Sequence, residues 1–162
     1  MCGNRHMRDV RALLGGAKCS VDYYQREYRW ATKRIAELTD DLSKKVLESY
    51  EVGDKRTAVE GCGHYFYGSI IVSDKEGKKF VIDGQQRLTS ITLLLMLLHC
   101  RLTDAEQRGQ LAELIFSQKF GMRSFNIDVS ERNACMEVLF TGKSAEEAGQ
   151  PESVVNNFRM LS

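Results

Sequence analysis

Apolar residues recur at helical spacing along much of the chain. Ile35, Leu38 and Leu42 lie three to four residues apart between charged positions, and they predict a long helix that Thr32 caps. A continuous apolar run predicts a second, buried helix over residues 88–102. Shorter helices are predicted for Val10–Leu14, from Thr103 with a capping box to Glu106, from Ser130, and from Ser153 onwards.

Stretches rich in aromatic and β-branched residues predict strands between these helices. Tyr65–Val72 and Lys79–Ile82 flank the turn-forming residues 74–77, which predicts a β-hairpin. Cys19–Tyr24 and Ser124–Ile127 are typical of shorter extended segments. This order of elements predicts an α+β domain in which a small sheet containing the hairpin is packed by helices and the C-terminal part is helical.

The last predicted helix has an apolar face that nothing later in the sequence covers. Its apolar residues are Val154, Val155, Phe158 and Leu161. Exposing such a face costs about 25 cal/mol per Å². We therefore expect the natural protein to continue past Ser162, or this helix to pack against another subunit.

Composition and charge restrict the class of protein. The chain has 162 residues and a net charge of +1, so no overall field favours nucleic acid or a membrane surface. The first 30 residues carry six basic and three acidic side chains, which predicts only weak, salt-dependent DNA binding. Five cysteines, an odd number without a Cys-x-x-Cys, and no secretory signal indicate the reducing cytoplasm. No apolar run reaches the roughly 20 residues of a membrane span.

The first candidate site lies where a strand, a glycine and a helix meet. Asp83 ends the strand, Gly84 turns the chain, and polar residues open the helix: Gln85, Gln86, Arg87, Thr89 and Ser90. The beginning of a helix attracts anions, and a guanidinium group is a forked donor suited to phosphate. A carboxylate beside them is suited to hold Mg²⁺ or to orient a water. A strand-to-helix turn capped by Asp83 and followed by solvated residues fits the same pattern.

The second candidate site is the aromatic and charged stretch Tyr23–Trp30. Aromatic side chains interleaved with arginines stack on bases and contact phosphates. Aromatic residues also anchor cores with their polar ends outward. Tyr28 and Trp30 directly precede the predicted long helix, which favours a packing role for these two. Both interpretations of the stretch stay open.

Other chemistry-bearing residues form no pattern of a known site. Cys62 and His64 offer two metal ligands, whereas a closed zinc site needs four. His99 and Cys100 lie on the apolar helix and are typical of the core or its edge. The sequence has neither a P-loop nor a Gly-x-Ser-x-Gly elbow, which argues against an ordinary P-loop NTPase and an α/β-hydrolase.

Three blocks occur in the following order: Tyr24-Gln25-Arg26-x-Tyr28-x-Trp30, Tyr67-Gly68-Ser69-Ile70, and Val81-Ile82-Asp83-Gly84-Gln85-Gln86-Arg87-Leu88-Thr89-Ser90. Together they resemble the N-terminal domain family of GmrSD-type restriction proteins over residues 10–102. Asp22 and Glu27 stand where that family usually has proline, which makes this extended segment less rigid.

The resemblance implies a fold, an activity and partners. The family is similar to the ParB/sulfiredoxin superfamily and occurs in modification-dependent restriction and phage defence. Residues 1–102 are then a ParB/sulfiredoxin-like nucleotide-binding core, and residues 103–162 a mainly helical extension. The domain is expected to bind and hydrolyse a nucleoside triphosphate with Mg²⁺. It would act on DNA through the full-length protein, with a downstream nuclease domain or partner subunit, and is compatible with a homo-oligomer.

The resemblance also assigns roles by residue match. Asp83, Gln86 and Arg87 are expected to be catalytic, with Asp83 as metal ligand. The nucleotide is expected to contact Gln25, Arg26, Gly84, Gln85, Gln86, Arg87 and Thr89. Two alternatives are a modified-DNA-binding module without turnover and a ParB-like nuclease. The nuclease is ranked last, because no acid cluster of the two-metal kind is visible.

Overall fold

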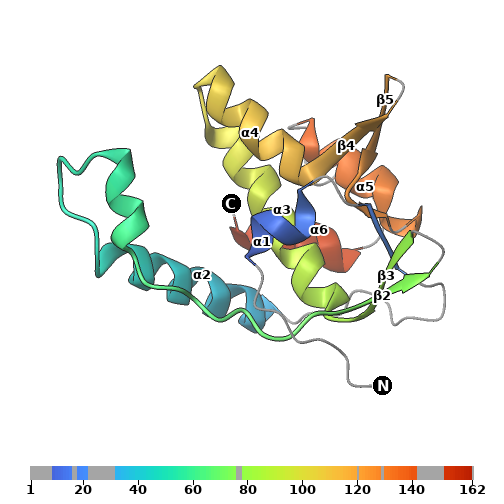
Figure 1. Ribbon diagram of the computed structural model, residues 1–162, viewed down its shortest axis with the longest axis horizontal. Coiled ribbons are helices and arrows are strands. Elements are labelled where there is room, and N and C mark those ends of the chain that lie inside the picture. The colour runs from blue at the N-terminus through green and yellow to red at the C-terminus, as the bar shows by residue number, and fades with distance from the viewer. Residues whose placement is uncertain are drawn as a thin grey trace.

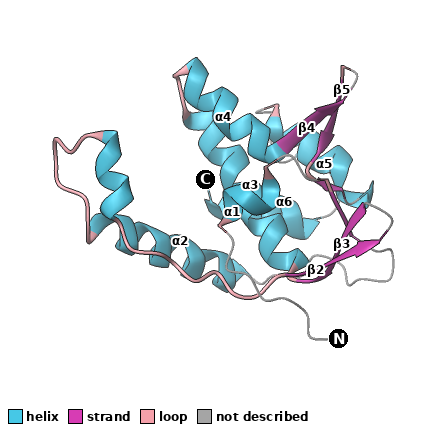
Figure 2. Ribbon diagram, viewed as in Figure 1, coloured by secondary structure: helices cyan, strands magenta, loops and turns pink. Residues whose placement is uncertain are grey.

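The computed structural model describes residues 9–15, 18–21, 32–75, 78–119, 121–128, 130–141 and 152–161. Within these ranges the chain is a mixed α+β fold with a four-stranded sheet, a separate two-stranded hairpin and six α-helices. The strands gather on one side of the molecule and helices form the rest (Figure 2). The predicted α+β class is therefore confirmed. The stretch 22–30 and the predicted loop 142–151 lie outside the described residues.

The four-stranded sheet has the order β2-β3-β1-β6. β1 (Cys19–Val21) runs parallel to β3 (Lys78–Asp83) and to β6 (Ile127–Asp128), whereas β2 (Ile71–Lys75) is antiparallel to β3. The predicted hairpin is thus present as β2 and β3. The same sheet also contains β1 beside β3 and β6 beside β1. Local patterns predicted extended segments at these two places but do not indicate their parallel pairing.

The strand predicted over Tyr65–Val72 is wrong for most of its length. β2 begins only at Ile71, and residues 65–70 belong to no helix or strand. Gly68 has a φ of +104°, a left-handed conformation that interrupts the regular pleat of a strand. Phe66 is 78% exposed, so the aromatic residues that suggested a half-buried strand are not all inside.

The helices agree with the predicted positions and differ at their ends. Their bounds are α1 Val10–Leu14, α2 Thr32–Leu47, α3 Gln85–Arg101, α4 Ala105–Ile115, α5 Ser130–Phe140 and α6 Glu152–Leu161, with a 3-10 helix, η1, at Arg56–Gly61. The cap of α4 is Asp104, which accepts from the backbone N–H of Gln107 at 2.8 Å, and not Thr103 as predicted. The carboxylate is one residue nearer to the first turn and is the stronger acceptor there. No helix in the described part of the chain is long and apolar enough to cross a membrane.

α3 is the central helix of the fold. It packs against α4, α5 and α6, and Figure 1 shows it running through the middle of the molecule. Its apolar residues Leu88, Leu93 and Met96 are at most 1% exposed. The predicted buried helix is therefore confirmed, although it begins three residues before residue 88.

The apolar face of α6 is buried within this chain. Val154, Val155 and Leu161 are 0%, 5% and 8% exposed, and α6 packs against α2, α3 and α5. The expectation that this face is left uncovered within the chain is therefore wrong, whereas continuation of the natural protein past Ser162 stays a prediction. The sequence pattern identified the face correctly, but it could not indicate that three earlier helices cover it.

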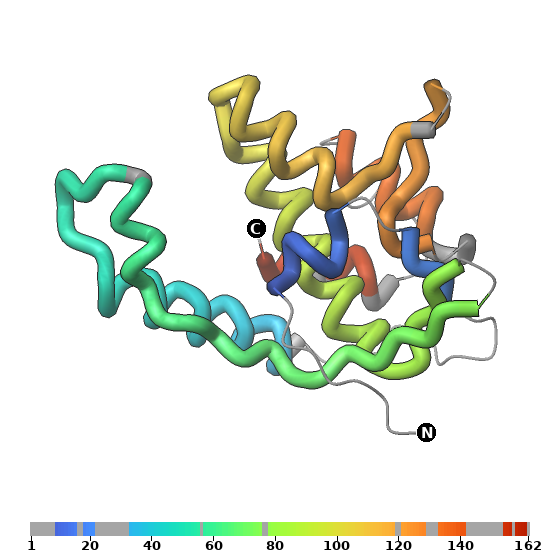
Figure 3. Tube along the Cα trace, in the orientation of Figure 1, coloured from blue at the N-terminus to red at the C-terminus, as the bar shows by residue number. Residues whose placement is uncertain are grey.

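The predicted apolar stripe of α2 is only partly buried. Ile35 and Leu38 are 0% and 3% exposed, whereas Val46, two turns further on, is 49% exposed. Figure 3 shows why: the first half of α2 lies on the body of the molecule and its second half projects away from it.

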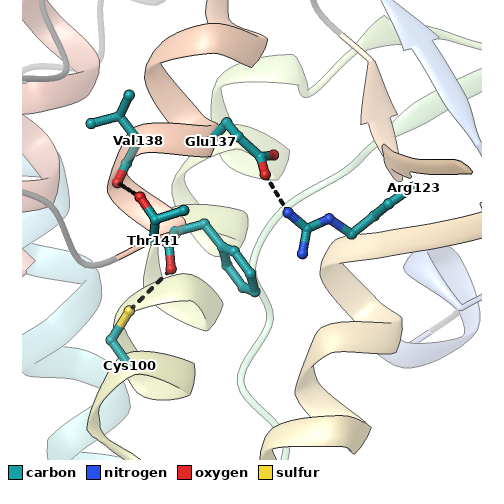
Figure 4. A network of polar contacts seen from close by, with 6 residues as sticks. Cys100, Arg123, Glu137, Val138 and Thr141 are labelled. Atoms are coloured by element: carbon teal, nitrogen blue, oxygen red, sulfur yellow. Dashed lines mark hydrogen bonds and ion pairs between the residues drawn. The ribbon is translucent and has the colours of Figure 1, made fainter.

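The hairpin of β4 (Phe116–Lys119) and β5 (Met122–Phe125) is joined to α5 by an arginine (Figure 4). The guanidinium of Arg123 donates to the carboxylate of Glu137 and lies 4.2 Å from the centre of the Phe116 ring. His99 packs against Phe140, with ring centres 4.5 Å apart, so its predicted place in the core is confirmed. Burial lowers the pKa of His99, and the positive charges of Arg108 and Arg123 add to the effect.

Asp128 ties the end of β6 to the start of β1. Its carboxylate lies 2.8 Å from the ammonium of Lys18 and accepts from the amide of Asn133 at 2.9 Å. The hydrogen bond from Lys18 is the main cause of a lowered pKa of Asp128 in the folded state. A carboxyl whose pKa is lower in the folded state stabilises the fold above its unfolded pKa, and this contribution disappears as the pH falls.

We predict that Asp128→Asn lowers the melting temperature at neutral pH and that its difference from the parent shrinks below about pH 4, near the unfolded pKa of an Asp. Thermal unfolding at pH 7, 5 and 3 measures both effects. Glu113→Gln, which neutralises an exposed carboxylate on α4, is the control. A pH-independent difference would contradict the assigned cause.

Candidate functional site

Gly84 connects β3 to α3 and sets the geometry of the site. It has a φ of +94° and occupies the N-cap position of α3. A Cβ placed on this residue would lie 2.9 Å from Cγ1 and 3.1 Å from Cα of Ile70. Both the backbone conformation and the close neighbour therefore require glycine at this turn.

The turn brings Asp83 and Arg87 together at the beginning of α3. Nη1 of Arg87 lies 3.8 Å from Oδ2 of Asp83, and the two side chains are 33% and 63% exposed. The guanidinium of Arg87 and the carboxylate of Asp83 thus lie side by side, accessible to solvent, at the N-terminal end of α3. The sequence predicted this pair to share one site, and the structure places the two side chains next to each other.

A neighbouring segment, residues 67–70, holds Arg87 in place. Nη1 of Arg87 donates to the carbonyl oxygen of Ser69 at 2.7 Å, and the hydroxyl of Tyr67 donates to the carbonyl oxygen of Arg87 at 2.9 Å. A Cβ on Gly68 would lie 2.8 Å from Nε of Arg87. The guanidinium is therefore fixed from one side by backbone that only a glycine allows to approach so closely.

This supporting segment was expected to be a strand, and no residue of it was predicted to belong to the site. One signal was available, because an isolated glycine within a strand-like run indicates a bulge or a close approach of another group. Gly68 is such a residue, and the other group is the side chain of Arg87.

An irregularity in the β2–β3 hairpin lies directly before Asp83. Ile71 pairs with Asp83, but Val72 pairs with Val81, so the register shifts by one residue and Ile82 is the extra one. Bulges of this kind redirect side chains and are frequent next to functional sites. Here the bulge alters the direction of the strand at the residue that carries the carboxylate.

The polar residues that open α3 differ in exposure. Gln86 and Arg87 are half-buried, whereas Gln85, Thr89 and Ser90 are 5%, 1% and 0% exposed. The hydroxyl of Ser90 donates to the carbonyl oxygen of Gln86 at 2.9 Å. Of the predicted site residues on the helix, Gln86 and Arg87 thus reach solvent, Arg87 beside Asp83, whereas Gln85 and Thr89 are buried.

The first predicted block cannot be placed against this site. Gln25 and Arg26 lie outside the described residues, as do Tyr28 and Trp30. Val21, the last described residue before the block, pairs in parallel with Val81. β1 therefore ends at the edge of the sheet where β3 reaches Asp83, and ligands of open sheets with parallel strands bind outside such carboxyl ends.

The side chains near Asp83 fit a metal ion only if a bound substrate and waters supply the other metal ligands. Among the described residues no three His, Cys, Asp or Glu side chains lie close enough together to hold a metal ion, and this includes Cys62 and His64. Asp83 is a single, well-exposed carboxylate. Mg²⁺ is commonly held by one or two carboxylates together with substrate phosphates and waters, and Asp83 fits that kind of site.

The fold and site define an α+β domain built around a strand–glycine–helix turn that presents an arginine–carboxylate pair to solvent. The chain belongs to the family described as GmrSD restriction endonuclease, N-terminal domain, whose family model matches residues 10–160. It is therefore the N-terminal domain of a restriction endonuclease of this type. No curated protein matches the chain in sequence.

Proposed function

We propose that this domain adopts a ParB/sulfiredoxin-like fold and binds and hydrolyses a nucleoside triphosphate with Mg²⁺ at the beginning of α3. The observation that carries the proposal is the 3.8 Å contact between Arg87 and Asp83 at the first turn of this 17-residue helix. The positive end of the helix dipole and a guanidinium both favour phosphate oxygens. A carboxylate beside a triphosphate is repulsive unless a cation lies between them, which is the reason for including Mg²⁺.

The proposal gives the side chains separate tasks. Arg87 binds phosphate oxygens, and its hydrogen bond to Ser69 fixes the guanidinium in advance. Asp83 holds the metal or orients the attacking water, and Gln86 offers an amide next to both. When bound, the metal supplies positive charge against the phosphates. Gln25 and Arg26 are proposed to contact the nucleotide from the end of β1, with Gly84, Gln85 and Thr89 completing the site.

Membership in a restriction endonuclease family implies that DNA is the substrate of the whole protein. We propose that residues 1–102 are the nucleotide-binding core, that residues 103–162 are a helical extension, and that nucleotide turnover is coupled to a nuclease domain or partner subunit. We place this activity in the cytoplasm; the free cysteines among the described residues, such as Cys62 and Cys100, are compatible with a reducing compartment.

Calorimetry and phosphate release on the 162-residue chain test the proposal. Each common nucleoside triphosphate is titrated with and without Mg²⁺, and phosphate release is followed under the same conditions. Binding of at least one triphosphate with Mg²⁺-dependent release is expected. Binding of modified DNA without turnover would instead favour a DNA-recognition module, and nicking of plasmid DNA by this chain would favour a nuclease.

DNA binding by this domain is expected to be weak and strongly salt-dependent. The excess of three positive charges in the first 30 residues neutralises few phosphates, and the net charge of the chain is only +1. Fluorescence anisotropy with a labelled duplex at about 50 and 200 mM salt measures the affinity and its slope. Nanomolar, sequence-specific binding at the higher salt concentration would contradict this expectation.

A further inference from the structure

Two oxygen atoms compete for one nitrogen of Arg87. Nη1 lies 2.7 Å from the carbonyl oxygen of Ser69 and 3.8 Å from Oδ2 of Asp83. The first contact is a short hydrogen bond, whereas the second is too long for one. Guanidinium and carboxylate groups normally approach to about 2.7–2.9 Å, and residues four positions apart at the start of a helix are well placed to do so. The ion pair that this spacing allows is therefore left open, and Nη1 donates to Ser69 instead.

The carbonyl of Ser69 is brought to Arg87 by segment 67–70, which is fixed to α3 at a second point. The hydroxyl of Tyr67 donates to the backbone carbonyl oxygen of Arg87 at 2.9 Å. Gly68 lies along the side chain of Arg87, since a Cβ on this glycine would be 2.8 Å from Nε and 3.3 Å from Cδ. In Figures 1 and 3 the chain returns along α2 and then passes the beginning of α3. The segment thus contacts both the backbone and the side chain of Arg87.

A neutral acceptor and a charged acceptor leave the guanidinium in different states. Segment 67–70 contains no charged residue, so its carbonyl orients Arg87 without neutralising the positive charge. One hydrogen bond to Ser69 also leaves other N–H donors of the guanidinium for a ligand. A closed pair with Asp83 would neutralise both side chains, and a phosphate would have to open it before binding. The apparent affinity of a ligand falls by the fraction of molecules in the form that can bind it.

We propose that Tyr67 is a positioning residue that keeps Arg87 and Asp83 apart. This inference rests on the proposed function, because the open pair leaves the guanidinium available to phosphate and the carboxylate available to a cation. Tyr67 acts through segment 67–70 and not by contact with the nucleotide. Without the tyrosine hydroxyl the segment loses its hydrogen bond to α3, the carbonyl of Ser69 withdraws, and Arg87 turns to Asp83.

A double-mutant cycle on metal-free triphosphate binding tests the proposal. Calorimetry compares the parent, Tyr67→Phe, Asp83→Asn and the double variant. Tyr67→Phe should raise the dissociation constant about 3- to 10-fold when Asp83 is present, because the closed pair then competes with the ligand. In the Asp83→Asn background the same change should have less than about a twofold effect, since no carboxylate captures Arg87. An equal loss of affinity in both backgrounds would overturn the proposal, because a general loosening of the site does not depend on Asp83.

Tyr65→Phe is the matched control for Tyr67→Phe. It removes the same atom two residues earlier in the chain, but the hydroxyl of Tyr65 donates to the carboxylate of Asp41 on α2 at 3.0 Å. This variant should bind triphosphate as the parent does. Circular dichroism of all the variants checks that each is folded at the temperature of the titration.

A second measurement needs no nucleotide. The Nε–H resonance of the Arg87 side chain is assigned by its absence in Arg87→Lys and is then recorded by NMR for the four chains of the cycle. Asp83→Asn should hardly move this resonance in the parent and should shift it clearly in Tyr67→Phe. The same response in both backgrounds would contradict the role of Tyr67. If the parent binds no triphosphate, the proposed function fails, while this spectrum still decides whether Tyr67 keeps the pair open.

Discussion

Arg87→Ala is expected to weaken binding of the nucleoside triphosphate about 10- to 100-fold, with and without Mg²⁺. A hydrogen bond to a charged group contributes roughly 1.5–3 kcal/mol, and the guanidinium of Arg87 is already held in place by the carbonyl of Ser69. Arg87→Lys should recover only part of the affinity, because an ammonium keeps the charge but loses the forked pair of donors. Arg101→Ala, at the other end of α3, is the control for removing an arginine from this helix.

Asp83→Asn is expected to separate binding from turnover. Asn removes a negative charge close to the phosphates, so metal-free binding should be unchanged or tighter. Mg²⁺-dependent phosphate release should fall by roughly 100-fold, the order of magnitude that a positioned acid or base contributes. Calorimetry and phosphate release on parent, Arg87→Ala and Asp83→Asn give both quantities. If folded forms of both variants bind and hydrolyse every common triphosphate as the parent does, the site lies elsewhere in the chain.

The elements of this fold could be predicted largely from local patterns. The apolar periodicity of α2, the buried run of α3 and the turn residues before β3 each depend on neighbours within a few positions. The predicted elements were wrong where two local features of the sequence favoured different structures. The run 65–70 has strand composition, yet the left-handed Gly68 and a contact with a distant helix keep it out of the sheet. At α4, two adjacent residues were both suitable caps, and the carboxylate of Asp104 occupies the position.

The candidate site was predictable only in its local part. Asp83 and Arg87 are four residues apart across a strand-to-helix turn, so their contact follows from the geometry of the turn. The support of Arg87 by Tyr67 and Ser69 joins residues 18 to 20 positions apart, and no periodicity reports such a contact. The burial of Thr89 depends in the same way on how the helices pack around α3. The sequence was thus sufficient to predict that Asp83 and Arg87 lie together, whereas the contacts that support Arg87 and the burial of the neighbouring residues required the fold.

Gly84→Ala tests whether this turn creates the site. The substitution should lower the free energy of unfolding by about 2–4 kcal/mol, because a non-glycine residue in the left-handed region costs about 1–3 kcal/mol and overpacking a close contact adds a similar amount. Crowding is expected because the new Cβ would lie 3.1 Å from the backbone Cα of Ile70. Backbone atoms cannot move aside as the end of a flexible side chain does.

Gly53→Ala is the matched control for Gly84→Ala. Gly53 has a similar φ of +102°, but nothing lies within 4 Å of the position that its Cβ would take. Denaturant unfolding of both variants therefore separates conformational strain from crowding against Ile70. We expect Gly84→Ala to be destabilised by at least about 1 kcal/mol more than Gly53→Ala. Its folded fraction should also bind triphosphate more weakly, because moving Ile70 shifts the adjoining carbonyl of Ser69 that holds Arg87. Equal destabilisation of the two variants, with binding by Gly84→Ala unchanged, would mean that segment 67–70 does not shape the site.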